Sequence, residues 1–383
     1  YITFSSANPF TLSLPSKSWN SQLYTSTNAA DWNEVTAANT ITAGSTNGVY
    51  KLYLCGTGNT RISAGYYSSR WTMGADPGTV ACSGNIETLL DYATVTAGAH
   101  PAMAANCFVF LFADCTALSS APALPATTLA DGCYNGMFKG CTGLTNAPAL
   151  PAITLANNCY NNTFNGCTGL TCVPALPATT LADYCYYNMF NGCTALTRAP
   201  ALPATTLAEG CYSGMFGGCT ALTRVPVLPA TTLAEGCYQE MFDGCTGIVL
   251  NTEGPGMAWS VPANAVDAPN WNTDMFAGTG GTFTDAPAIG ETYYLASGLP
   301  AAPAFAADGE GFVIGDGTAT IKIDNAESGL WYTVYRVDDL TQTNWVKIGD
   351  SIQATGSQVI FTIPRDPTVP RRFFKVVTSF TAP

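Results

Sequence analysis

Apolar residues recur at a spacing of four through the middle of the chain. In the copy that starts at residue 129 they form two rows, which are Leu129, Cys133 and Met137, and one position later Ala130, Tyr134 and Phe138. This spacing lines up one broad apolar face of a helix. It predicts a helix of about two to three turns, with Gly140 as the left-handed residue that ends it.

A short strand is predicted after this helix, within residues 142–150. Leu144 and Leu150 supply its apolar side chains. Pro148 and Pro151 have no N–H to donate to a neighbouring strand, so the strand must be short. Helix, tight turn, short strand and return loop would together make one coil.

The same unit returns every 26 residues, and its two cysteines are always eight apart. The cysteines of the six regular copies are Cys107 and Cys115, Cys133 and Cys141, Cys159 and Cys167, Cys185 and Cys193, Cys211 and Cys219, and Cys237 and Cys245. A seventh copy follows an insertion of eight residues and has Trp271 and Thr279 where the cysteines should be. Copies in register predict a solenoid, and the atypical last copy predicts its C-terminal cap.

Segments with strand-like alternation flank the repeats. We expect an N-terminal β domain and the start of the solenoid cap at 1–92, the solenoid at 93–283, a linker at 284–310 and a C-terminal β-sandwich at 311–383. The last segment contains five predicted strands, TATIKID, WYTVYRV, NWVKIG, QVIFTIP and RFFKVVTS, which are typical of an immunoglobulin- or fibronectin-like sandwich. The predicted fold class is therefore an α/β, leucine-rich-repeat-like solenoid between two β domains.

The string MFKGCTGLT and its copies resemble the core repeat of the BspA-like leucine-rich repeat proteins of bacterial surfaces. The resemblance covers residues 100–283, about half of the chain, and rests on the recurring Phe-x-Gly-Cys-Thr-x-Leu string. The period of 26 is longer than the unit usual in that group, and a second cysteine replaces an aliphatic residue ahead of the Met-Phe pair. The resemblance implies an extracellular adhesion or interaction protein, and it identifies no ligand.

Composition narrows the partners and the compartment. The net charge of −12, with only 10% charged residues, provides no basic patch for nucleic acid. No apolar run approaches the ~18 residues of a membrane span. The sequence begins with Tyr1 rather than Met, so we expect a leader to have been removed or to lie outside it. Fifteen cysteines with one histidine and no C-x-x-C pair favour an oxidising compartment over metal binding.

Two interpretations of the repeat cysteines are open. They either fill the core as buried thiols or close one disulfide within each coil. We favour disulfides, because the seventh copy has lost both cysteines together. Eight residues of unbroken helix would separate the Cα atoms by ~12 Å, so this pairing needs a chain reversal at Gly140. Cys55 and Cys82 would then pair with each other by elimination.

Cys172 is left over as a candidate free thiol. It stands in a column that varies freely from copy to copy, namely Ser120, Asn146, Cys172, Arg198 and Arg224. We interpret it as a tolerated substitution at an exposed position. The alternative is an intermolecular bridge or a reactive thiol.

Two further columns bear on binding. The first is Asp131, Asn157, Asp183, Glu209 and Glu235, which we interpret as solvated charge because one carboxylate per coil does not converge as a metal site requires. The second is an aromatic column, which we interpret as packing over the helix with phenol groups that reach water. The alternative is a glycan- or protein-binding strip made of Tyr134, Tyr160, Tyr186, Tyr187, Tyr212 and Tyr238, with Asn135, Asn161, Ser213 and Gln239 beside the aromatic residues.

No catalytic constellation is recognisable, so we expect no enzyme, no cofactor and no metal site. His100 is the sole histidine, no nucleophile motif lies near it, and its position at the domain junction favours a structural role. The stretch DGEGFVIGDG, with Asp308 and Asp316, lacks the ligand spacing of a calcium loop and predicts a Gly-Asp turn.

Two non-enzymatic functions remain. The first is a secreted or cell-surface interaction protein that presents the solenoid to a protein or glycan ligand on a cell surface. The alternative is a structural subunit that assembles with further copies of itself into an extracellular filament or surface layer. We favour the first because of the family resemblance.

Overall fold

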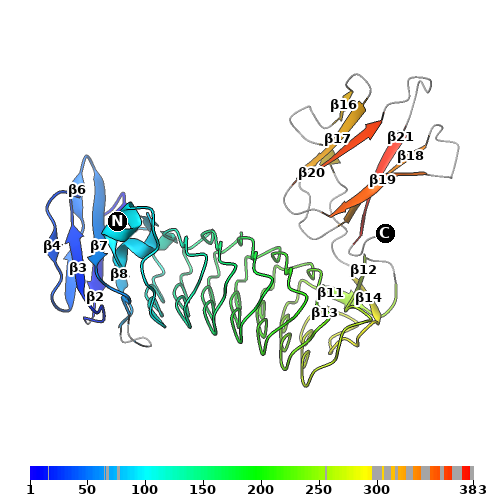
Figure 1. The fold of residues 1–383 in the computed structure, drawn as a ribbon, viewed down its shortest axis with the longest axis horizontal. Coiled ribbons are helices and arrows are strands. Elements are labelled where there is room, and N and C mark those ends of the chain that lie inside the picture. Colours follow the sequence, from blue (N-terminus) through cyan, green and yellow to red (C-terminus); the bar gives the residue numbers. More distant parts are fainter. Residues whose placement is uncertain are drawn as a thin grey trace.

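The computed structural model describes residues 1–295, apart from 16, 64, 66–68, 76–77 and 255–256, and seven strands beyond residue 295 (Figure 1). An N-terminal β domain, drawn in blue, continues directly into a row of stacked coils. The coils end at a small sheet, where β11 to β14 are labelled.

Two sheets form the N-terminal domain. The larger has the order β10-β9-β1-β7-β3-β4, with β6 paired to β7, and the smaller has the order β5-β2-β8. The strands of the larger sheet are β1 (Ile2–Ser6), β3 (Gln22–Ser26), β4 (Asn33–Glu34), β6 (Gly44–Thr46), β7 (Val49–Thr57), β9 (Val80–Ser83) and β10 (Leu118–Ser120). Those of the smaller are β2 (Thr11–Leu14), β5 (Asn39–Thr42) and β8 (Thr72–Gly74). Alternate residues of β1 are buried, because one face of its sheet covers the core that also holds Trp19 and Trp71.

The N-terminal domain supplies the surface on which the first coil stacks. β10 belongs to that coil and pairs in parallel with β9. The N–H of Ile62 donates to the carbonyl of Cys107 at 2.8 Å, and the N–H of Trp71 donates to that of Leu111 at 2.8 Å. These bonds satisfy carbonyl groups of the first coil, which has no preceding coil of its own.

Two short helices follow β9 at the junction. They are the 3-10 helix η2 (Ile86–Leu89) and the α-helix α1 (Tyr92–Thr96). Nδ1 of His100 lies 2.8 Å from Oε2 of Glu87, whose side chain is buried in η2. The sole histidine of the chain therefore contacts the buried carboxylate of η2 at the junction.

The predicted helix in each repeat is wrong. Among the described residues α1 is the only α-helix, and it lies outside the repeats. Each repeat contains a run of turns at the position of the predicted helix. The fold is thus a solenoid of turns joined to β-sheets, and the α/β, leucine-rich-repeat-like class does not apply.

Five overlapping β-turns form this run, which we call the turn wall. In the second coil, five N–H groups each donate to the carbonyl three residues earlier, at N···O distances of 3.0–3.2 Å. They belong to Cys133, Asn135, Met137, Lys139 and Cys141. The alternate N–H groups donate to the next coil at 2.8–3.0 Å, and they are those of Gly132, Tyr134, Gly136, Phe138 and Gly140. All ten backbone donors of residues 132–141 are therefore used, half within the coil and half between coils.

Every fourth residue of the turn wall has a positive φ. In the second coil these are Gly132, Gly136 and Gly140, at 58°, 60° and 71°. Each is the third residue of a turn, the place where a type II turn requires positive φ and where Gly and Asn avoid a Cβ clash. In the third coil Asn158 and Asn162 take the first two places, at 57° and 54°. Turns therefore set the spacing of four, with two residues inward and then two outward.

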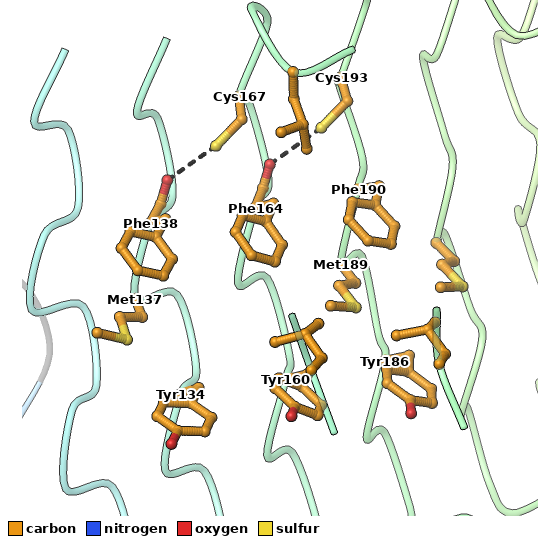
Figure 2. Close-up of a cluster of buried hydrophobic side chains, with 14 of the residues drawn as sticks. Tyr134, Met137, Phe138, Tyr160, Phe164, Cys167, Tyr186, Met189, Phe190 and Cys193 are labelled. Atoms are coloured by element: carbon orange, nitrogen blue, oxygen red, sulfur yellow. Dashed lines mark hydrogen bonds between the residues drawn. The ribbon is translucent and has the colours of Figure 1, made fainter. Parts of the chain in front are cut away.

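Equivalent apolar side chains stack along the solenoid (Figure 2). The first aromatic column, with ring centroids 5.7–5.9 Å apart, is Phe108, Tyr134, Tyr160, Tyr186, Tyr212 and Tyr238. The second, at 5.3–5.9 Å, is Phe112, Phe138, Phe164, Phe190, Phe216, Phe242 and Phe276. A row of methionines lies between them, where Thr163 replaces one and donates its hydroxyl to the carbonyl of Tyr134 at 2.9 Å.

The predicted strand of each repeat is reduced to single bridges in the regular coils. Thr154 bridges in parallel to Thr128 and Thr180, and Asn146 bridges to Cys172. Longer pairing occurs only at the two ends of the solenoid, in β10 and in β11 (Val249–Asn251). The prolines around position 148 account for this, because they remove the donors that a continuous ladder needs.

The seventh copy continues the stacking without its cysteines. The N–H of Tyr238 donates to the carbonyl of Trp271 at 2.7 Å, and that of Phe242 donates to Met275 at 2.9 Å. The hydroxyl of Thr279 turns back to the carbonyl of Phe276 at 2.8 Å. A non-thiol residue can therefore fill either cysteine position of the coil.

A four-stranded sheet and an aromatic cluster close this end of the solenoid. The sheet has the order β12-β14-β11-β13, with β12 (Met257–Ser260), β13 (Gly280–Gly281) and β14 (Thr292–Leu295). Trp259 and Phe283 cover the ring of Phe276, at 5.4 and 6.1 Å. Because β14 pairs with both β11 and β12, part of the predicted linker 284–310 belongs to this sheet.

Seven strands are described beyond residue 295. They are β15 (Ala304–Phe305), β16 (Phe312–Ile314), β17 (Thr318–Asp324), β18 (Trp331–Val337), β19 (Val346–Gln353), β20 (Gln358–Pro364) and β21 (Phe373–Ser379). β15, β16 and β20 pair with β17, and β19 and β21 pair with β18. The last five strands lie at the five segments expected from the sequence. Asp308 and Asp316, of the predicted Gly-Asp turn, lie outside the described residues.

Candidate functional site

The outward-facing residues of the turn wall form a broad polar surface. They come in pairs, such as Asn161 with Asn162, between inward pairs such as Thr163 with Phe164. Because the coils repeat in register, each outward position becomes a column along the solenoid. The columns are rich in amides and acids and hold one lysine, Lys139.

The acidic column is a hydrogen-bonded ladder. Oδ1 of Asp131 accepts from the N–H of Asn157 at 3.1 Å, and Oδ1 of Asn157 accepts from the N–H of Asp183 at 3.2 Å. Oδ1 of Asp183 accepts from Glu209 at 3.2 Å in the same way. These side chains serve backbone donors at the start of the turn wall, so the solvated-charge interpretation was incomplete.

A hollow of about 450 Å³ lies in the polar surface of the first three coils. Its lining consists of five asparagines, one aspartate and one glycine, namely Asn106, Asn135, Asn157, Asn158, Asn161, Asp131 and Gly132. The side-chain amides of Asn106 and Asn135 make no hydrogen bond to another described residue. Nδ2 of Asn161 donates to Oδ1 of Asn158 at 2.8 Å, which fixes the orientation of that pair. The hollow therefore offers oriented amide donors and acceptors to a ligand.

Two tyrosines stand one coil beyond the hollow. Tyr184 occupies the position of Asn158 in the next coil, and Tyr187 occupies that of Asn161. Their rings meet edge to face at 6.0 Å and are half-buried. The hydroxyl of Tyr184 donates to Oε1 of Glu209, and this bond is the main cause that raises the pKa of Tyr184 to about 12. An aromatic edge thus borders the amide-lined hollow.

The tyrosine strip predicted from the sequence is not a surface. Five of its six members are at most 1% exposed, and they are Tyr134, Tyr160, Tyr186, Tyr212 and Tyr238. Even the phenol oxygens of Tyr134 and Tyr160 are buried, contrary to the expectation that they reach water. They stack because position 134 of the repeat faces inward. Tyr187 alone lies at the surface, one position later in the coil.

Sequence reasoning named Asn135 and Asn161 only as neighbours of the tyrosine strip, and it missed Asn106, Asn158 and Tyr184. The available signal was local: a column otherwise filled by Gly and Asn holds an aromatic residue at position 184. Tyr184 has φ of 54°, and its ring lies over Gly210, where an added Cβ would come within 2.4 Å of it. A bulky residue fits there only because the next coil has no side chain at that place.

The disulfides expected within each coil are not present. All fifteen cysteines are free thiols. The run of turns continues through Gly140 to Cys141 without the reversal that pairing needs, so Tyr134, Met137 and Phe138 lie between Cys133 and Cys141 along the turn wall. Each cysteine instead faces its equivalents in neighbouring coils, and we call the two resulting rows the thiol columns.

Cys55 and Cys82 are not bonded either. β1 lies between their strands β7 and β9, so two strand spacings, or roughly 10 Å, separate them. Cys82 points into the core, whereas Cys55 is half-buried on the other face of the sheet. A disulfide cannot bridge this geometry.

Both thiol columns are buried, and the thiols of the column from Cys115 to Cys245 donate hydrogen bonds to backbone carbonyls. Sγ of Cys167 donates to the carbonyl of Phe138 at 3.1 Å, and Sγ of Cys193 donates to that of Phe164 at 3.2 Å, each in the preceding coil (Figure 2). Burial, followed by the neighbouring thiols Cys107 and Cys159, raises the pKa of Cys133 well above its usual value. Both columns therefore pack as small apolar side chains, and the column from Cys115 to Cys245 also has satisfied S–H donors.

We predict that Cys172 is the fast-reacting thiol of the native protein. It is the one exposed cysteine, whereas burial raises the pKa of Cys167 to about 12 and leaves little thiolate at neutral pH. Cys55, half-buried with a raised pKa, should react more slowly. Intact-protein mass spectrometry of the fully reduced protein with iodoacetamide is expected to show one rapid adduct before denaturation and fifteen after it. Cys172→Ser should abolish the rapid adduct, and rapid labelling of a column thiol would contradict the prediction.

These features define a solenoid of stacked β-turns with an amide-rich outer surface. Comparison with protein-family models, curated proteins and solved structures finds no match. The resemblance to BspA-like repeats stays a prediction. Within the described residues, no three His, Cys, Asp or Glu side chains converge as a metal site, and no helix has the length and apolar character of a membrane span.

Proposed function

We propose that the protein is a secreted or cell-surface interaction protein that binds a neutral glycan at the amide-lined hollow. The observation that carries the proposal is the hollow itself, in which Asn106 and Asn135 have uncommitted amides and whose far side is bordered, one coil on, by Tyr184 and Tyr187. Planar amides bond to neighbouring sugar hydroxyls, and tyrosine rings pack on the apolar face of a sugar ring.

The character of the surface supports this ligand class over others. An apolar small molecule would need a lining of apolar side chains, and the hollow has none. A polyanion would be repelled by a chain of net charge −12. The resemblance to bacterial surface repeats agrees with an exposed binding role.

We expect Asn135→Ala and Tyr187→Ala each to weaken glycan binding by about tenfold or more, since each removes a directional contact. The matched control is Gln239→Ala, which changes the same outward column in the sixth coil, far along the solenoid from the hollow. The measurement is a screen of neutral oligosaccharides with the whole chain, followed by titration calorimetry.

Light scattering over a range of concentrations separates this proposal from self-assembly. A 40.0 kDa monomer that binds an oligosaccharide agrees with the proposal. A mass that grows with concentration, together with no glycan binding, would favour the structural subunit instead. Binding of a host protein that survives Asn135→Ala would also overturn the glycan site.

A further inference from the structure

The two thiol columns place cysteine at positions where the packing of the turn wall does not require it. Six cysteines follow one another in adjacent coils in each column, and twelve of the fifteen cysteines of the chain lie there. The seventh copy shows that Trp and Thr fill the same places. Packing therefore does not demand sulfur at these positions.

The spacing between coils suits a disulfide. Equivalent rings flanking the cysteines lie 5.3–5.9 Å apart in neighbouring coils. Disulfides join Cα atoms about 4.4–6.8 Å apart, so a cysteine and its equivalent 26 residues later are within reach. Cys107 and Cys159 are the cysteines close enough to Cys133 to raise its pKa, and Cys115 and Cys167 do the same for Cys141. Cys133 and Cys141, which belong to the same coil, are not neighbours of each other in this sense.

We propose that the thiol columns are sites of cross-linking between coils, formed by exchange with a low-molecular-weight disulfide such as oxidised glutathione. An even number in each column allows complete pairing. The expected bonds are Cys107–Cys133, Cys159–Cys185, Cys211–Cys237, Cys115–Cys141, Cys167–Cys193 and Cys219–Cys245.

The reaction balances as two exchange steps. The thiolate of one cysteine attacks the glutathione disulfide, which gives a mixed disulfide and releases one glutathione thiolate. The thiolate of the neighbouring coil then attacks the protein sulfur and releases the second. Two protein thiols are oxidised, one glutathione disulfide is reduced, and the two thiol protons pass to the two glutathione thiolates. Because the columns are buried, the exchange takes place while coils are apart, during folding or opening.

Refolding tests the connectivity. Reduced, denatured protein carrying Cys172→Ser is refolded in a buffer of oxidised and reduced glutathione, and its disulfides are mapped by mass spectrometry without reduction. We expect peptides linked between cysteines 26 residues apart, with Cys55 and Cys82 left as free thiols. Links between cysteines eight residues apart, or a fully reduced product, would overturn the proposal.

A second variant distinguishes the two connectivities by the identity of the thiol that it frees. Adding Cys159→Ser leaves Cys107 paired with Cys133 and three cysteines beyond the substitution, so one more free thiol is expected, and it must be Cys185 or Cys237. Pairing within coils would release Cys167 instead. The cross-linked protein should also melt at a higher temperature than its reduced form, and equal melting temperatures would count against staples between coils.

Discussion

Replacing Tyr160 by alanine should destabilise the solenoid by about 3–5 kcal/mol, the usual cost of emptying a large aromatic site in a packed core. Its side chain is 1% exposed and stacks on Tyr134 and Tyr186, both at 5.7 Å. In a stack of coils each unit is stabilised by its two neighbours, so the loss affects two interfaces at once. Urea unfolding followed by circular dichroism measures the change.

Tyr160→Phe is the matched control for that experiment. The phenol oxygen of Tyr160 is buried and has no hydrogen-bond partner among the described residues. Removing it should leave stability unchanged or raise it by about 1 kcal/mol, because an unpaired buried polar group is costly. A loss for Tyr160→Phe as large as for Tyr160→Ala would mean that the hydroxyl, rather than the stacked ring, supports the column.

The repeat itself could be predicted from the sequence because it depends on spacing alone. Cysteines 26 apart in unbroken register require equivalent positions in successive coils, whatever the local backbone. The degenerate copy with Trp271 was expected to be the end of the stack, and in the structure its other side is covered by Trp259 and Phe283 rather than by another coil. Five of the strands beyond residue 310, β17 to β21, were visible as alternating segments.

The backbone within the repeat could not be inferred from apolar spacing. The turn wall buries two residues and then exposes two, so its pattern has a period of four residues. Over one short coil this pattern is indistinguishable from the apolar face of a helix. The residues between the apolar positions carried the information about the backbone. Gly132, Gly136 and Gly140 are also four apart and favour positive φ, which an α-helix interior does not allow.

The surface position of the candidate site was missed for the same reason. Helical geometry placed the tyrosine column at the rim, whereas the turns bury Tyr134 and expose Asn135. Moving the surface by one residue exchanges an aromatic strip for an amide column. Only Tyr187 lies outward in both descriptions.

Gly192→Val should destabilise the solenoid by about 2–3 kcal/mol, through the backbone rather than through a lost contact. Gly192 has φ of 74°, and a Cβ built on it would lie 3.6 Å from the Cα of Gly166 in the preceding coil. A β-branched side chain in this conformation clashes with its own backbone, and its methyl groups would also push the two coils apart. Chemical denaturation gives the loss directly.

Gly192→Asn tests whether φ or bulk is responsible. Asparagine adopts the left-handed conformation more readily than other residues, as Asn188 does at φ of 50° one turn earlier in the same coil. We therefore expect it to cost less than about 1 kcal/mol, although it is nearly as large as valine. If both variants lose the same stability, crowding against Gly166 limits this column. If valine is tolerated, the left-handed turn residue does not fix the four-residue spacing, and the turn wall does not explain the repeat.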